Sequence, residues 1–261
     1  RVLNIKGTPS APSEYLPDFA AEVEVDRVTS PLRELEAATL ALLPRLLNPV
    51  TGFKGYPSSE HVRVGPSSFA MYLASVLKAH TGADAALLNS GAVRGHTNYQ
   101  NTDPPGMLSY AQLCQECPFP SELLVCLIDG ATLAEAVQSS RALWPAPCAS
   151  ALQTDLGCQT DATQKLCRVD GAPLEPTRLY RVLLDSYDLQ SNPVFVTYAE
   201  RARREDPGRI PPLDAGRPCF VMLLDYFCRQ MWRTSEGHAA HALPPMRCRP
   251  CAAAHALPPM R

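Results

Sequence analysis

The stretch TGADAALLNSGAVRG, residues 81–95, decides the fold more than any other part of the chain. Its apolar run at 85–88 is short and is followed at once by Asn89, Ser90 and Gly91, which favour a turn. An apolar run that ends in a polar, glycine-containing turn is typical of a buried strand that leads into a functional loop. The pattern therefore predicts a central strand with a candidate site at its carboxyl end.

A helix is predicted directly before this strand. Ser67 or Ser68 can cap its start, and Gly82 stops it. Apolar residues recur on one face at helical spacing: Phe69, Tyr72, Leu73, Val76 and Leu77. Further upstream, Ser30 and Pro31 predict the start of another helix whose leucines continue to Leu46, with Pro44 kinking or ending it. The alternating residues 22–25 suggest a short strand in the lead-in.

Strands and helices continue to alternate downstream of the turn. Ser109 with Gln112, and Thr132 with Glu135, each form a capping-box pattern. Strands are predicted at 123–128, 167–169 and 179–184, a hairpin between Cys158 and Cys167, and a final helix from Phe220 to Met231. This alternation predicts an α+β (mixed α/β) fold in a single compact domain.

The chain divides into three predicted parts. Residues 1–29 look like a linker from an upstream domain, because the chain begins with Arg1 and lacks a secretory signal. Residues 30–233 form the folded domain. In residues 234–261 the segment HALPPMR occurs twice, in a composition that cannot bury enough apolar area to order itself, so we expect a disordered tail.

Charge and cysteine content narrow the classes of function. A formal net charge of -2 and a pI near 6.3 argue against a nucleic-acid partner, and no apolar run is long enough to span a membrane. Ten cysteines favour an oxidising location, which would be extracellular, periplasmic or at a cell surface. Cys158 and Cys167 are expected to form a local disulfide. Two Cys-x-x-Cys pairs, Cys114/Cys117 and Cys248/Cys251, lie too far apart for a zinc ribbon.

Three segments, in order, resemble the C-terminal domain of the 5′-nucleotidase family, which includes UDP-sugar hydrolases. They are ADAALLNSGAVR at 83–94, then GMLSYAQL at 106–113 with Cys117-Pro118-Phe119 and Asp129-Gly130-Ala131-Thr132-Leu133, and finally DGAPL at 170–174 with the strand leading to Tyr187. The resemblance covers roughly residues 55–195. It implies a mixed sheet with flanking helices that binds a nucleotide or nucleoside.

The resemblance also implies roles for single residues. Phe119 and Tyr187 would sandwich a base, since stacking on an aromatic ring suits any base, although either ring could instead be core. Arg94 would bind phosphate rather than serve as a solvated surface residue, and Gly91 would allow close approach. Asn89 would read a base edge, or simply suit the turn. Arg63 is placed in the substrate site only by its position upstream.

The sequence departs from the family's pattern in two places. The family follows its second aromatic with Gly-Gly-Asp-Gly, whose carboxylate binds ribose, whereas Asp188-Leu189-Gln190-Ser191 stands here. The family's metal-binding motifs do not occur: His238 and His241, the nearest imitation, have no acidic partners. We expect no cofactor in this chain and no catalysis by it alone, with a divalent metal pair such as zinc held by an upstream metallophosphoesterase domain. The alternatives are a non-catalytic scaffold or adhesion module and, well behind, a thiol or zinc protein.

Overall fold

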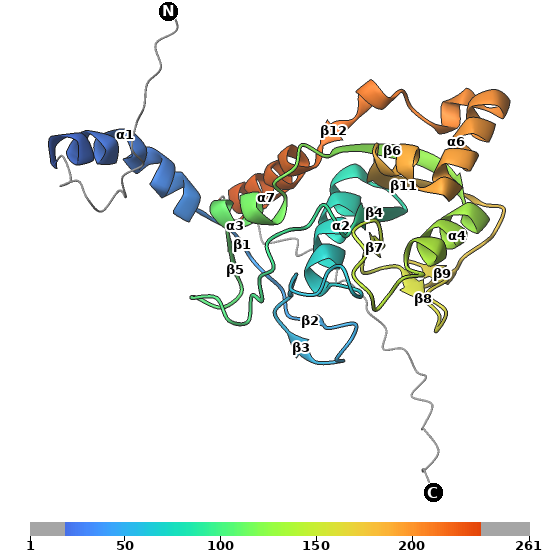
Figure 1. Cartoon of the computed structure of the whole chain (residues 1–261), viewed down its shortest axis with the longest axis horizontal. Coiled ribbons are helices and arrows are strands. Elements are labelled where there is room, and N and C mark those ends of the chain that lie inside the picture. Colours follow the sequence, from blue (N-terminus) through green and yellow to red (C-terminus); the bar gives the residue numbers. More distant parts are fainter. Residues whose placement is uncertain (1–18, 236–261) are drawn as a thin grey trace, which may run out of the picture.

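A five-stranded mixed sheet forms the centre of the molecule (Figure 1), whose computed structural model describes residues 19–235. Only the neighbours β11 and β4 run parallel, and every other pair in the sheet is antiparallel. From one edge to the other the strands are β12 (Arg217–Pro218), β6 (Glu122–Asp129), β11 (Leu179–Asp185), β4 (Ala85–Asn89) and β7 (Leu152–Thr154).

Helices cover both faces of this sheet. Side chains alternate along β4, so that Ala86 and Leu88 enter one apolar cluster while Ala85 and Leu87 enter the other. The first cluster packs under α2 (Ser68–Thr81) and α7 (Cys219–Ser235), and the second under α4 (Gly130–Ser140) and α6 (Pro193–Glu205). All five residues of β4 are buried, as expected for a strand covered on both faces. The predicted fold class, a single α+β domain with a mixed sheet and flanking helices, is confirmed.

Shorter elements surround this centre. β1 (Thr39–Leu42) pairs with β5 (Met107–Ser109), and β2 (Leu46–Leu47) pairs with β3 (Lys54–Gly55). The predicted hairpin is present as β8 (Gln159–Thr160) and β9 (Leu166–Val169), which β10 (Ala172–Pro173) extends. The remaining elements are α1 (Phe19–Ala37), α3 (Tyr110–Glu116), α5 (Asp188–Ser191) and two short 3-10 turns at Pro207–Arg209 and Leu213–Ala215.

The caps confirm two predicted helix starts and correct a third. Ser67 caps α2 by accepting from the Ala70 amide, Gly82 ends it in the left-handed conformation, and Ser109 and Gln112 form the expected capping box on α3. The box predicted from Thr132 and Glu135 is wrong, because α4 begins at Gly130 and the Asp129 carboxylate accepts from the Thr132 amide at 2.8 Å. Both residues therefore lie inside the helix, and a stronger cap precedes them.

The prediction for residues 22–46 is also wrong. Residues 22–25, expected as a strand, belong to α1, which starts before Ser30, contains Pro31 and ends at Ala37. Leu42 lies in β1, which pairs with β5, and Leu46 lies in β2, which pairs with β3, so strand pairing overrides the helical spacing of these leucines. The body of α1 projects from the domain (Figure 1), and none of its residues is buried.

The cysteines of the described residues are all free thiols. The expected disulfide between Cys158 and Cys167 is not formed, since Cys158 is buried and Cys167 is exposed. Their Sγ atoms have different partners: Cys158 donates to Asp155 Oδ2 at 3.3 Å, and Cys167 to the Gln159 carbonyl at 3.3 Å. The second Cys-x-x-Cys pair, the HALPPMR segments, and His238 and His241 lie outside the described residues.

Candidate functional site

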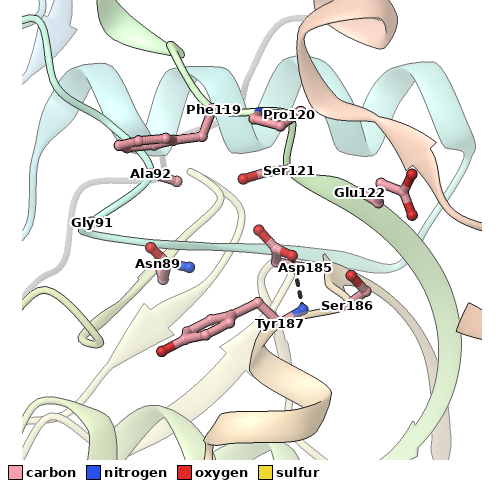
Figure 2. A pocket seen from close by; sticks show the side chains of 10 residues that line it. All are labelled: Asn89, Gly91, Ala92, Phe119, Pro120, Ser121, Glu122, Asp185, Ser186 and Tyr187. Carbon is pink, nitrogen blue, oxygen red and sulfur yellow. Dashed lines mark hydrogen bonds between the residues drawn. The ribbon is translucent and has the colours of Figure 1, made fainter. Parts of the chain in front are cut away.

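A pocket of about 400 Å³ opens where three segments meet: the turn after β4, the segment between α3 and β6, and the end of β11 (Figure 2). This volume lies within the range of small-ligand pockets. The turn predicted at the carboxyl end of the strand that is now β4 therefore lines this pocket. The lining residues are Asn89, Gly91, Ala92, Phe119, Pro120, Ser121, Glu122, Asp185, Ser186 and Tyr187.

Two aromatic rings lie on opposite sides of this pocket (Figure 2). Phe119 is 44% exposed and Tyr187 is 60% exposed, so neither ring belongs to the core. Phe119 follows Pro118 between α3 and β6, and Tyr187 directly precedes α5. A ring exposed at a pocket can present one flat face to a planar ligand, and two such rings could hold that ligand between them.

Asn89 and Gly91 form the floor beside these rings (Figure 2). Asn89 is the last residue of β4 and is 9% exposed. Strand pairing fixes its backbone, and burial restricts its side-chain amide. Gly91 donates its N–H to the Ala149 carbonyl at 2.7 Å, and a Cβ there would stand 3.1 Å from that carbonyl oxygen. The turn therefore favours glycine because a neighbouring backbone passes close by.

Arg94 lies at the rim of the site. Its Nε donates to the Gly91 carbonyl at 2.7 Å, and its guanidinium carbon lies 5.0 Å from the centre of the Phe119 ring. The side chain is thus fixed by one hydrogen bond and one cation–π contact, although the residue is exposed. Its remaining N–H groups are suited to an anionic group bound beside Phe119.

Arg63 is not brought to this pocket. Its carbonyl accepts hydrogen bonds from Trp144 Nε1 at 3.0 Å and from the Cys148 amide at 2.8 Å. Its Nε is buried without a hydrogen-bond partner. Four of the six predicted site residues line the pocket (Asn89, Gly91, Phe119 and Tyr187), Arg94 contacts two of these, and Arg63 stands apart.

Two aspartates that are not among the predicted site residues lie at the same site. Asp185 ends β11, is only 5% exposed and accepts from the Tyr187 amide at 2.9 Å (Figure 2). Asp188 is buried behind it. Burial and the charge of Asp185 raise the pKa of the Asp188 carboxyl to about 7, although a hydrogen bond from the Asn89 side chain lowers it. The signal that could have found them is their position at the end of an apolar strand, one residue on either side of Ser186 and Tyr187.

Among residues 19–235 no group of three or more His, Cys, Asp or Glu side chains is arranged to hold a metal ion. No helix within the same residues is long and apolar enough to cross a membrane. The pocket is lined by two aromatic rings, one side-chain amide and two carboxylates, and one guanidinium lies at its rim. Apolar walls with a few polar groups are typical of small-molecule sites.

The architecture defines an α+β domain with a mixed sheet and a pocket of small-ligand size, and comparison with known proteins gives its family. The family model for the 5′-nucleotidase C-terminal domain matches residues 49–199, and the chain belongs to that family. The matched segment contains the whole pocket. Curated protein sequences gave no match.

Solved structures share the fold at low identity. A 5′-nucleotidase precursor from Thermus thermophilus aligns with a TM-score of 0.52 and 17% identity, over 84% of this chain and 42% of its own. A putative 5′-nucleotidase from Staphylococcus aureus, solved with alpha-ketoglutarate, gives 0.52 and 15%, over 84% and 42%. The NAD nucleotidase of Haemophilus influenzae gives 0.50 and 14%, over 83% and 39%. The chain therefore spans about two fifths of the length of these proteins.

Proposed function

We propose that the pocket binds a nucleotide or nucleoside, with the base between Phe119 and Tyr187. The observation that carries this proposal is the position of two exposed rings on opposite sides of one pocket. A purine or pyrimidine has two flat faces, and stacking on each ring is worth roughly 1–3 kcal/mol in proteins that bind single strands. Asn89 would hydrogen-bond to the base edge, and Arg94 would bind the phosphate beside Phe119.

In this proposal the domain is the substrate-binding part of a 5′-nucleotidase-like metallophosphoesterase that hydrolyses phosphate esters in nucleotide catabolism. Metal ions would polarise the phosphate and generate the attacking hydroxide, and an upstream domain would have to supply their ligands. The names of the structural neighbours support the substrate class, since two are described as 5′-nucleotidases and one as an NAD nucleotidase. This chain would bind and orient the ligand, and by itself would release no phosphate.

A carboxylate of the pocket would accept hydrogen bonds from the hydroxyl groups of the ribose. Asp185 points into the space between the two rings (Figure 2), where its free oxygen could accept from a hydroxyl. The family's ribose-binding turn is replaced in this chain by α5, so a nearby carboxylate of different origin would take over that contact.

The second candidate is a non-catalytic scaffold or adhesion module. It is favoured by the loss of the Gly-Gly-Asp-Gly turn and by Arg63, which does not reach the pocket. An extracellular, periplasmic or cell-surface location is retained as part of the proposal. The described cysteines lend it no support, because all of them are free thiols.

Isothermal titration calorimetry with AMP, adenosine and ribose 5-phosphate tests the proposal. The expected order of affinity is AMP above adenosine, and adenosine above ribose 5-phosphate, because the last ligand lacks a base to stack. No measurable binding of AMP or adenosine would favour the scaffold. Equal binding of AMP and ribose 5-phosphate would exclude the base sandwich.

A further inference from the structure

A buried carboxyl group lies behind the rim of the pocket. Glu116 is the last residue of α3, and it is inaccessible to solvent. Leu113, one turn earlier, is equally buried and apolar. An apolar side chain would thus satisfy packing at this end of α3, whereas a buried carboxyl group is costly unless its oxygens accept hydrogen bonds.

Three donors converge on the Glu116 carboxyl group. Oε1 accepts from Ser59 Oγ at 2.8 Å and from the Tyr99 hydroxyl at 3.1 Å, and Oε2 accepts from the Gly95 amide at 3.0 Å. All three partners can donate at once only if both oxygens act as acceptors. The cluster is therefore a fully built acceptor site filled by this chain's own donors.

These contacts fasten the loop that carries Arg94. The Arg94 amide donates to the Glu116 carbonyl at 2.9 Å, directly before the Gly95 contact. Ser59 links Glu116 to a further residue of this loop, because its Oγ accepts from the Thr97 amide at 2.9 Å. A Cβ on Gly95 would overlap the Glu116 carboxyl group, so glycine is needed for this close approach.

The same residue is connected to the other side of the rim. Phe119 lies three residues after Glu116, and the Arg94 guanidinium lies over its ring at 5.0 Å. Glu116 thus joins the two segments whose side chains meet at the edge of the pocket. We propose that Glu116 is a positioning residue, whose carboxyl group fixes residues 94–99 to the end of α3 and thereby holds Arg94 over Phe119.

The surroundings of Glu116 make its hydrogen bonds unusually dependent on protonation. Burial is the largest influence and raises the pKa of its carboxyl group to about 7, although the three donors lower it. The titratable groups that face it are the Tyr99 phenol and the Cys117 thiol, and the pKa of each is raised. Both are uncharged near neutral pH, so no cation among these groups compensates an ionised Glu116.

Three variants separate positioning from packing. Glu116→Gln keeps one carbonyl acceptor for Gly95 and offers its amide to Ser59 and Tyr99, so it preserves the attachment. Glu116→Leu fills the same space and removes every acceptor. Leu113→Ala, in the same helix, is the matched control, because it leaves a cavity but removes none of the hydrogen bonds of the Glu116 carboxyl group.

Hydrogen exchange of the unliganded protein tests the attachment itself. In Glu116→Leu we expect exchange at Gly95 to accelerate roughly tenfold or more, since its hydrogen bond is lost. Glu116→Gln should stay within about twofold of the unchanged protein. Leu113→Ala should lower the melting temperature without a selective effect at Gly95. If Glu116→Leu does not fold, Glu116→Ala replaces it, because it also removes both acceptor oxygens and its smaller side chain fits in the space of the carboxyl group. It should likewise accelerate exchange at Gly95 selectively.

Ligand binding tests the consequence for Arg94, and this second step rests on the proposed function. The ratio of AMP to adenosine affinity should fall in Glu116→Leu toward its value in Arg94→Ala, and should be retained in Glu116→Gln and Leu113→Ala. An unchanged exchange rate at Gly95 in the variants without the carboxyl contact overturns the positioning role, whatever the ligand data show. If the unchanged protein binds neither ligand, the proposed function fails, while the exchange result still decides the role of Glu116.

Discussion

The Arg94 guanidinium lies over the Phe119 ring, with its central carbon 5.0 Å from the ring centre, while its Nε donates to the Gly91 carbonyl at 2.7 Å. One side chain therefore connects the turn after β4 to the segment between α3 and β6. The contact is exposed, where a cation–π pair contributes about 0.5–1 kcal/mol. Its main effect is to fix the direction of the guanidinium beside the pocket.

We predict that Arg94→Ala weakens AMP binding about tenfold or more and adenosine binding much less, because only AMP carries the phosphate and a charge-assisted hydrogen bond is worth about 1.5–3 kcal/mol. Arg94→Lys, which keeps the charge but loses the planar group, should restore AMP binding only in part. Calorimetry at low and high salt measures both effects, and the difference between ligands should shrink at high salt. Equal losses for AMP and adenosine would contradict a phosphate contact.

The two pocket rings should contribute to binding rather than to folding. Phe119→Ala and Tyr187→Ala are each expected to weaken adenosine binding by roughly 1–3 kcal/mol and to lower the melting temperature little, since both rings are substantially exposed. Phe69→Ala is the matched control. That ring is fully buried and stacks on Tyr99 at 4.7 Å, so its loss should cost about 3–5 kcal/mol of stability. A large loss of stability in Phe119→Ala would place this ring in the core instead.

Most of the fold could be predicted because local and tertiary signals agree. The serine cap, the apolar face and the terminal Gly82 of α2 are all local, and each is present. The buried strand β4 and its turn were equally clear, since burial on both faces leaves an uninterrupted apolar run. The predictions failed at β1, where Leu42 belongs to both a helical spacing and a strand that depends on its distant partner β5.

The candidate site was predictable only in part, for a physical reason. Phe119 and Tyr187 stand on loops and carry a ring, so a sequence pattern can mark them. Glu116 owes its properties to burial and to partners distant in the sequence, such as Ser59, and neither feature can be read from neighbouring residues. The end of an apolar strand marks the position of Asp188, but its burial cannot be read there. Arg63 shows the opposite case, since position alone placed it in the substrate site and it does not line this pocket.

The two thiols once expected to form a disulfide should differ sharply in reactivity. Cys167 is exposed on β9, whereas Cys158 is buried and donates to Asp155, and burial raises the pKa of its thiol further. A thiolate is the reactive form, so we expect a maleimide reagent to label Cys167 in the native protein and Cys158 only after unfolding. Mass spectrometry of digested protein measures this. Protection of both residues, reversed by a reductant, would indicate the disulfide after all.

The dependence of the free energy of unfolding on pH should reflect the raised pKa values of two buried carboxyl groups. Asp188 and Glu116 have ordinary pKa values of 3.8 and 4.5, and in the folded protein both are raised to about 7. The fold therefore holds their protons more tightly than the unfolded chain does. Their contribution to the free energy of unfolding is complete below about pH 4 and is lost as the pH rises to about 7.

Urea unfolding between pH 5 and 8 should show this loss, and Asp188→Asn and Glu116→Gln should each reduce its slope, because an amide does not titrate. Each substitution is expected to recover on the order of 1–3 kcal/mol at pH 8 relative to pH 5. His80 works in the opposite direction, since burial lowers its pKa, but it is present in every variant and its effect cancels in the comparison. Identical slopes in the unchanged protein and both variants would mean that neither carboxyl group holds a proton in the folded protein at neutral pH.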